Sequence, residues 1–224
     1  MPKFDITKLN VAIDRLLEST TNSRHRFLLQ AYSRYRYLEV AGRYEEILAP
    51  EMMSADPVYH FNQAGIDTAV RGRELVRNLY RIWAETNQSI FFVEQEEVAV
   101  ADHFIASVMT LYQQVSAKGL KQEKLPSAIS RRLVERVLAK NGCTIKDSDV
   151  YLYKSVGMQM LWRYDDRGRL LGEDVWESDP SEAKLLKLDP QDVLTIKESA
   201  RLVAPLIKPL PSFEESVSGR LVAA

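Results

Sequence analysis

DVYLYKSVGMQMLWRYDDRGRLLGEDVWES, residues 149–178, is the stretch that decides the fold. It holds two β-rich runs, 149–165 and 169–178, which are joined by the turn sequence Asp165-Asp166-Arg167-Gly168-Arg169. Glycine in such a turn can adopt the positive φ that tight hairpins need. The stretch therefore predicts a long antiparallel hairpin.

A second pair of β-rich runs lies upstream, at 90–102 and 103–114, and flanks the turn residues Asp102 and His103. It predicts a second hairpin. The segment between the two hairpins, 115–148, is far longer than a plain hairpin loop, so we interpret it as an insertion. Its centre, 127–140, has the pattern of a basic amphipathic helix, which would act either as a lid or as a surface decoration.

The N-terminal half is mainly helical in pattern. Apolar spacing and capping residues predict helices over 8–19, from about 20 to 41, over 44–48 and from Gly72 to about 86, with one short strand at 58–63. Near the end, Thr195 and Glu198 form a capping box for a helix that Pro205 should end, and the Pro-rich remainder is expected to be extended or disordered. We predict one domain over 1–180 and a C-terminal extension over 181–224.

Composition excludes several classes of function. Hydrophobic residues make up 46% and charged residues 27% of the 224 residues, as in an ordinary globular protein. Lys and Arg total 30 against 31 Asp and Glu, so no basic excess favours nucleic acid or an anionic membrane. Since no 18 apolar residues run together and the start lacks a signal-peptide pattern, we expect a cytoplasmic protein.

Motifs for cofactors and metals are missing from the sequence. It has no glycine-rich phosphate loop, no GxSxG elbow, no HExxH and no GxGxxG after a strand. With three histidines and one cysteine, Cys143, the chain has too few ligands for a structural zinc site and cannot form an internal disulfide. We therefore predict no cofactor and no metal, and we interpret Cys143 as an incidental thiol.

Three stretches resemble the nuclear transport factor two-like superfamily and its SnoaL-like branch. They are RYLEVAGRYEEILAPEM at 36–52, YHFNQAGIDTAVRGRELVRNLYRIW at 59–83, and MLWRYDDRGRLLGEDVWES at 160–178. The order of helices, short strand, helix and four long antiparallel strands is also similar. The resemblance covers about 20–178 without the insertion.

This resemblance implies an α+β fold in which a curved mixed or antiparallel sheet wraps around N-terminal helices as a cone with an apolar pocket. Members include polyketide cyclases, ketosteroid isomerases, scytalone-type dehydratases and limonene-type epoxide hydrolases, which act without cofactors on small apolar molecules. Others only bind ligands or partners, and many are dimers. In dehydratase-like members an Asp commonly stands in the turn after the long helix, whereas here the turn reads Gly42-Arg43-Tyr44, which implies that this base is missing.

Asp174 is the acid that the alternation of the last strand places inward. It shares a face with Leu170 and Trp176, whereas Glu173 and Glu177 fall on the opposite face. A carboxylate on an apolar wall has a raised pKa and suits general acid or base catalysis near neutral pH. The alternative is a structural pair between Asp174 and an arginine or a backbone amide.

His60 is the other candidate catalytic residue, and Asn62 is its expected companion in orienting a substrate. Both lie on one face of the strand at 58–63, with Tyr59 and Phe61 on the other. Two interpretations stay open at this point. Either His60 and Asn62 line the pocket, or the two aromatic residues do and the polar pair faces solvent or a dimer interface.

The sequence thus predicts a proton-transfer enzyme, either a dehydratase, an isomerase or a cyclase, acting on a small hydrophobic cyclic molecule of polyketide, steroid or terpenoid type. The alternatives are a non-catalytic binding protein and a dimeric assembly protein of the same fold. Val156, Met158, Met160, Trp162 and Tyr164 are expected to form one buried face of their strand. The expected substrate-binding residues are Asn62, Tyr32, Tyr35, Trp83, Met158, Met160, Trp162 and Trp176. We expect a homodimer that binds neither nucleic acid nor a membrane.

Overall fold

The computed structural model describes residues 5–63, 66–116, 146 and 148–217. The helices are α1 (Val11–Ser19), α2 (Ser23–Val40), α3 (Tyr44–Ile47), α4 (Arg73–Glu85), α7 (Ile196–Val203) and α8 (Phe213–Val217), with short 3-10 helices at Ile6–Lys8, Pro180–Glu182, Pro190–Asp192 and Ala204–Leu206. The strands are β1 (Val58–Gln63), β2 (Ile66–Arg71), β3 (Phe91–Ala101), β4 (Phe104–Ser116), β5 (Val150–Tyr164), β6 (Leu170–Glu177) and β7 (Lys184–Lys187).

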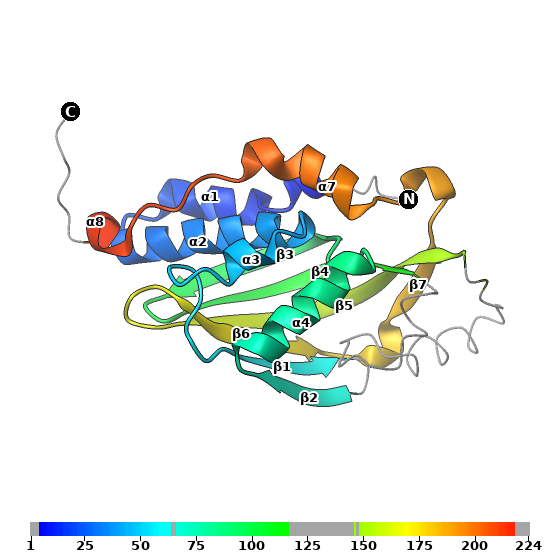
Figure 1. The fold of residues 1–224 in the computed structure, drawn as a ribbon, viewed down its shortest axis with the longest axis horizontal. Helices are drawn as coiled ribbons and strands as arrows, with labels where there is room; N and C mark the ends of the chain where they lie inside the picture. Colours follow the sequence, from blue (N-terminus) through cyan, green and yellow to red (C-terminus); the bar gives the residue numbers. More distant parts are fainter. Residues whose placement is uncertain (1–4, 64–65, 117–145, 147, 218–224) are drawn as a thin grey trace.

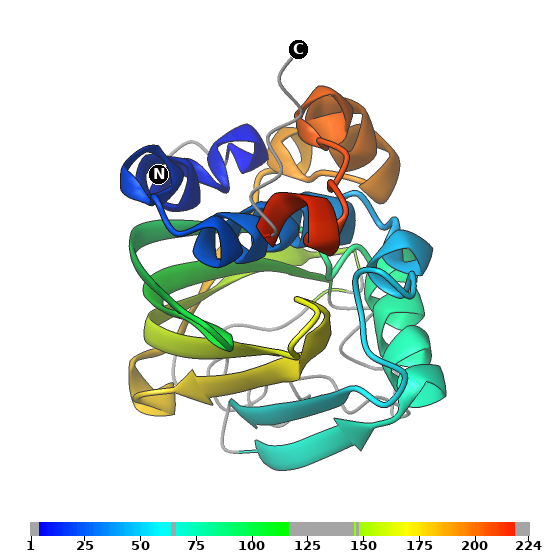
Figure 2. The ribbon, with the colours of Figure 1, turned by 90° about the vertical axis from the view of Figure 1, so that its left-hand side faces the viewer.

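One curved sheet carries the fold, in the order β2-β1-β6-β5-β4-β3, and β7 pairs with β5. All pairs are antiparallel except β1 with β6, which is parallel. Helices α1, α2, α7 and α8 lie over one side of the sheet, and α4 runs alongside between them and the β1–β2 end (Figures 1 and 2). This arrangement confirms the predicted α+β class with a curved mixed sheet against N-terminal helices.

Most predicted elements are present with small shifts in their ends. Both hairpins form, the strand at 58–63 is β1, and Asn22 caps α2 by accepting a hydrogen bond from the backbone N–H of His25 at 3.1 Å. The capping box at Thr195 also forms, and α7 ends before Pro205 as predicted. The expected helix at 127–140 and Cys143 lie outside the described residues.

Two expectations about irregular segments are wrong, a Gly-containing loop after the strand at 58–63 and a wholly extended or disordered Pro-rich end, and one strand, at 184–187, was not expected at all. Residues 66–71 form β2 rather than a loop, because they pair antiparallel with all of β1. Residues 184–187 form β7 on the edge of β5. The Pro-rich end is not wholly extended, since Phe213–Val217 form α8, and the ring of Phe213 meets Phe27 edge-on at 5.1 Å between centroids.

Two β-bulges change which side chains face the helices. In β6 the register shifts between Tyr164–Leu170 and Arg163–Gly172, so Leu171 is an extra residue and the alternation reverses after Leu170. In β5 the register shifts at Gly157, which has a φ of +69°. The inward alternation of Met158, Met160 and Trp162 is therefore broken there, and Val156, which we expected on the buried face, is 51% exposed.

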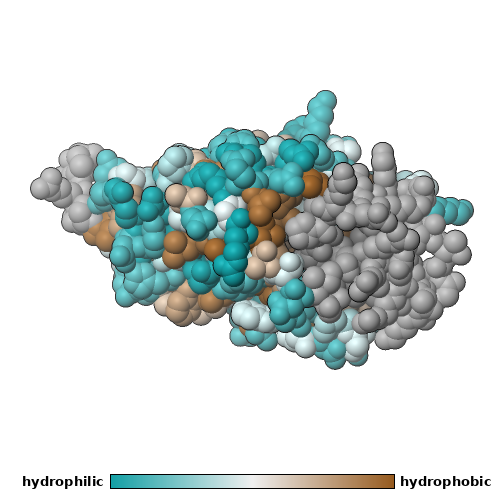
Figure 3. All heavy atoms as spheres, turned by 60° about the horizontal axis from the view of Figure 1, so that its bottom comes forward, coloured by the Kyte–Doolittle hydropathy of each residue, from teal (hydrophilic) through white to brown (hydrophobic). Residues whose placement is uncertain are grey.

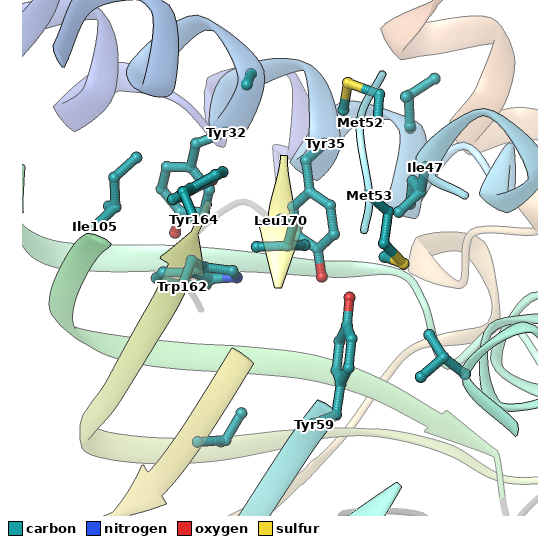
Figure 4. Close-up of a cluster of buried hydrophobic side chains, with 14 of the residues drawn as sticks. Tyr32, Tyr35, Ile47, Met52, Met53, Tyr59, Ile105, Trp162, Tyr164 and Leu170 are labelled. Atoms are coloured by element: carbon teal, nitrogen blue, oxygen red, sulfur yellow. The ribbon is translucent and has the colours of Figure 1, made fainter. Parts of the chain in front are cut away.

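The core lies between the helices and the inner face of the sheet. It contains Tyr32 and Tyr35 of α2, Tyr59 of β1, Trp162 of β5 and many aliphatic side chains. Figure 4 shows Tyr35 and Tyr59 pointing toward each other across this layer. A second cluster, which includes Val40 and Val203, packs α7 against α2. No helix among the described residues is long and apolar enough to cross a membrane.

Candidate active site

A cavity of about 50 Å³, measured as the volume open to the centre of a water-sized sphere, lies between α2, α4 and the inner face of the sheet. That volume has room for a few water molecules. Its wall is formed by Tyr32, Tyr35, Arg36 and Glu39 of α2, Phe61 and Gln63 of β1, Trp83 of α4, Phe91 of β3, Met109, Leu111 and Gln113 of β4, Met160 and Trp162 of β5, and Glu173 and Val175 of β6.

Glu173 is the buried carboxyl of this wall, with 4% of its surface exposed. Its Oε2 accepts a hydrogen bond from the hydroxyl of Tyr35 at 3.0 Å and another from Nε1 of Trp162 at 2.9 Å. In the described part of the chain, both hydrogen bonds to this carboxyl end on Oε2. Oε1 is therefore the oxygen left to carry a proton or to meet a ligand.

Three tyrosines extend the hydrogen bonds away from Glu173. The hydroxyls of Tyr35 and Tyr80 lie 2.6 Å apart, and those of Tyr80 and Tyr59 lie 3.0 Å apart. Since Tyr35 donates to Glu173, Tyr80 donates to Tyr35 and Tyr59 to Tyr80, each with its single proton. The chain holds the carboxyl in one orientation whether or not it is ionised.

The pKa of Glu173 is raised to about 7, chiefly because burial removes the hydration of the charged form and, to a much smaller extent, because of the nearby Asp174 charge. The hydrogen bonds from Tyr35 and Trp162 act in the opposite direction but are smaller. Burial also raises the pKa of Glu39 well above its usual value, with the Glu173 charge as the second cause. The two carboxyls titrate as a pair, so ionising one makes the other hold its proton more strongly.

Arg36 and Glu96 form a buried ion pair beside the cavity. Nη1 of Arg36 lies 3.0 Å from both carboxylate oxygens, and the side chains are 2% and 3% exposed. The guanidinium also stands 5.3 Å from the ring centroid of Tyr32. The pair fixes a cation in the wall whose charge is already balanced.

This arrangement can move protons. A carboxyl with a pKa near neutrality is present in both protonation states at pH 7, which is the requirement for a general acid or base. Glu39, Tyr35 and Arg36 add further polar groups to a wall that is otherwise aromatic and aliphatic. An apolar wall with a few converging polar groups is typical of small-molecule sites.

His60 and Asp174 are brought together as predicted, but they lie on the face of the sheet that points away from the cavity. Nδ1 of His60 is 2.5 Å from Oδ1 of Asp174, and Nε of Arg163 is 2.9 Å from Oδ2. The inward placement of Asp174 was wrong because the bulge at Leu171 reverses the alternation, so Glu173 faces inward instead. Asp174 thus has the arginine partner of the structural alternative, and a catalytic role for this pair stays a prediction.

The open question about β1 is also answered. Tyr59, Phe61 and Gln63 are buried, whereas His60 keeps 42% of its side chain exposed and Asn62 is exposed. His60 and Asn62 therefore do not line the cavity. Trp176, next to Asn62 in the register, is 48% exposed on the same outer face.

The other expected substrate-binding residues divide as follows. Tyr32, Tyr35, Trp83, Met160 and Trp162 line the cavity, whereas Met158 is packed in the core and is not part of the wall. Placement in the wall does not test whether these residues bind a substrate, so that role stays a prediction.

Sequence reasoning missed Glu173, Glu39, Arg36 and Gln63. Glu39 and Arg36 could have been found, because they share the helix face of Tyr32 and Tyr35 at spacings of three and four residues. Gln63 lies on the same face of β1 as Phe61, two residues away, and could have been found in the same way. Glu173 could not have been found, because a bulge depends on pairing between strands and leaves no reliable signal in one strand.

Within the described segments, no group of three or more His, Cys, Asp or Glu side chains could hold a metal ion.

Comparisons with known proteins give a structural likeness only. No protein-family model and no curated protein matches the chain. Among 21 matching chains of solved structures is the epoxide hydrolase/cyclase-like enzyme SalBIII, described as acting in pyran ring formation in the polyether salinomycin; it is 9% identical, with a TM-score of 0.44 over 70% of this chain and 95% of that one.

A second match is a protein of Novosphingobium aromaticivorans that is described as NTF2-like with a cystatin-like fold. It is 17% identical, with a TM-score of 0.37 over 78% of this chain and 91% of that one. Likenesses of this degree assign no activity, so the function has to be argued from the chain's own residues.

Proposed function

We propose that the protein is a cofactor-independent proton-transfer enzyme, of dehydratase, isomerase or cyclase type, that acts on a small hydrophobic cyclic molecule in the cavity. Glu173 is its general acid or base. The observation that carries the proposal is a buried carboxyl with a pKa of about 7, held by Tyr35 and Trp162 in the wall of an apolar cavity.

Ionised Glu173 would take a proton at Oε1 from a carbon next to a substrate carbonyl and return it to another carbon, which is an isomerisation. Protonated Glu173 would instead give its proton to a departing hydroxyl, which leaves as water, and the carboxylate so formed would take a proton from the neighbouring carbon, whose C–H electron pair forms the double bond. In both cases Oε2 keeps its two hydrogen bonds. The site therefore does not have to rearrange its own hydrogen bonds during the transfer.

The size of the cavity limits the substrate. A cavity that holds benzene measures about 150 Å³, so a ring can enter the 50 Å³ space only if wall side chains move. Phe91 and Met160 are only partly buried and are the parts of the wall best able to move. Methionine is also the most adaptable apolar side chain.

Deuterium exchange tests the proposal without knowledge of the natural substrate. The protein is incubated in D₂O with a panel of cyclic ketones that carry a C–H bond next to the carbonyl, and uptake of deuterium is followed by NMR. We expect exchange above the buffer rate for at least one ketone. Glu173→Gln should lower the enzymatic rate by about 10²- to 10⁴-fold, because the amide cannot accept the proton.

Asp174→Asn is the matched control, since it makes the same chemical change one residue away on the other face. It should leave the exchange rate within a few-fold of the wild type. If instead Asp174→Asn abolished exchange and Glu173→Gln did not, the site would be on the outer face. If no ketone exchanged but the panel bound, the protein would be the non-catalytic binding protein that the fold also permits.

The outer face favours a second function, assembly into a homodimer. Phe104, Val108, Val156 and Trp176 are 40%, 48%, 51% and 48% exposed, and Val108 and Trp176 flank Gln159 in the strand register, so they lie near each other on this face. In Figure 3, which views the molecule from below Figure 1, brown hydrophobic patches lie between teal hydrophilic ones. Sedimentation of wild type and Trp176→Glu tests this: a dimer that the substitution weakens supports it, and a wild-type monomer at micromolar concentration contradicts it.

A further inference from the structure

Two buried nitrogens in the cavity wall have no hydrogen-bond partner among the described residues. They are Nη2 of Arg36 and Nε2 of Gln63, whose residues are 1% and 2% exposed. Buried donors without an acceptor are rare, because each costs free energy. Both come from residues that line the same cavity, one from α2 and one from β1.

The partners already present explain why these nitrogens are left over. Arg36 meets both oxygens of Glu96 through Nη1 alone, so Nη2 takes no part in this ion pair. By contrast, Gln113 lines the cavity too, but its Nε2 donates to the backbone oxygen of Gln88 at 2.8 Å. Unpartnered nitrogens in the wall are therefore a property of particular positions, and the hydroxyl of Tyr32 is a third wall group without a partner among the described residues.

Charge decides what kind of acceptor they can receive. Arg36 is already neutralised by Glu96 at 3.0 Å. The two acids of the wall, Glu39 and Glu173, have pKa values raised by burial, and neither supplies a positive charge in either protonation state. A ligand carboxylate or phosphate would add a net negative charge to a buried site without a free counter-charge, which is costly. A neutral oxygen would satisfy the donors at no such cost.

We propose that Arg36 Nη2 and Gln63 Nε2 form a subsite for a neutral acceptor oxygen, either a carbonyl, an ether or an epoxide. The ligand of the cavity is then an uncharged ring that carries such an oxygen. This inference deepens the proposed function by naming the substrate class, and it rests on that proposal only for the role of Glu173. Binding alone can test it.

Three probes of similar shape separate the possibilities: cyclopentanone, methylcyclopentane and cyclopentanecarboxylate. Binding is measured at pH 6 from the NMR shifts of the indole N–H groups of Trp83 and Trp162, which line the cavity. Cyclopentanone should bind at least tenfold more tightly than the carboxylate. Gln63→Met keeps the side-chain length but removes the amide. It should weaken the binding of cyclopentanone at least fivefold and leave the affinity for methylcyclopentane unchanged.

Gln113→Met is the matched control, because its amide is already used; it should leave the affinity ratio of ketone to hydrocarbon within twofold of the wild type. A double variant, Arg36→Met with Glu96→Met, removes the second donor without leaving a lone buried charge. It should likewise weaken the binding of cyclopentanone more than that of methylcyclopentane. The proposal is overturned by any of three results: cyclopentanone does not bind, the carboxylate binds as tightly as cyclopentanone, or Gln63→Met leaves the affinity ratio of ketone to hydrocarbon unchanged.

These results are independent of turnover. If the wild type shows no deuterium exchange but still prefers the ketone, the proposed enzymatic activity is refuted and the proposed subsite is supported. If the wild type catalyses exchange but Gln63→Met does not change ketone binding, the proposed activity is supported and the proposed subsite is refuted.

Discussion

The two faces of β6 place neighbouring acids in opposite surroundings. Glu173 points into the core, accepts hydrogen bonds from Tyr35 and Trp162, and has a pKa raised to about 7. Asp174 points outward and lies between Arg163 and His60, whose side chains are 33% and 42% exposed. A buried carboxyl among apolar rings tends to keep its proton, because its charged form is poorly hydrated. Asp174, by contrast, lies in a partly exposed cluster of charged and polar side chains.

The comparison shows how the alternation of side chains along a strand separates two kinds of acid. One faces the outer ion pair, and its neighbour in the sequence faces the inner site for proton transfer. One extra residue, Leu171, decides which acid is on which face. An acid and a histidine in contact are therefore not sufficient grounds for a catalytic assignment. The surroundings of each group decide what it can do at neutral pH.

The largest effect is expected at Gly172, the residue that follows the bulge. A Cβ there would lie 1.8 Å from the backbone oxygen of Val58, and its φ is +138°. Gly172→Ala should lower the free energy of unfolding by more than about 4 kcal/mol, measured by urea denaturation, because β1 and β6 cannot stay paired.

Gly157→Ala is the control for this substitution. Its φ is +69°, but the nearest atom to a Cβ is Oγ of Ser178 at 3.5 Å, an ordinary contact. It should cost only about 1 kcal/mol of backbone strain. Equal losses for the two variants would contradict the close approach at Gly172.

The next effect is a pH dependence of stability from Glu173. Its folded pKa is about 7, against 4.5 for an ordinary, solvated glutamate. Because the folded state binds the proton more tightly, the contribution is complete below about pH 4 and is lost as pH rises through 7. We expect a loss of about 3 kcal/mol across this range, and Glu173→Gln should remove most of it. A wild-type curve that is flat from pH 4.5 to 7.5 would speak against the raised pKa.

The smallest effect is expected at the outer pair. His60 is exposed enough that its pairing with Asp174 is screened by solvent. His60→Ala should change the free energy of unfolding by less than about 1 kcal/mol. A double-mutant cycle with Asp174→Asn measures the coupling, and a value above about 2 kcal/mol would show that the outer face is more than a solvated pair.

Much of the fold could be predicted from the sequence because its signals are local. The turn at Asp165–Arg169, the caps at Asn22 and Thr195 and the period of α4 each act within a few residues. Strand β2, IDTAVR, was missed although half of its residues are apolar, as in β1. It is ordered by pairing with β1.

The site was predicted only in part, for a physical reason. The aromatic wall, Tyr32, Tyr35, Trp83 and Trp162, follows from periodicity. The acid does not, since the bulges at Leu171 and Gly157 are fixed by contacts between strands. Inward and outward positions can be assigned from sequence only up to the first such irregularity.

The most direct test of the central claim is the titration of Glu173 itself, by NMR of protein labelled with ¹³C at the glutamate carboxyls. The account predicts two glutamate carboxyls, Glu39 and Glu173, that titrate well above the others, and the one with a pKa near 7 disappears in Glu173→Gln. Tyr35→Phe should raise this pKa further, since the lost hydrogen bond favours the ionised form. A Glu173 resonance that titrates near 4.3, the value of an ordinary glutamate, would contradict the account.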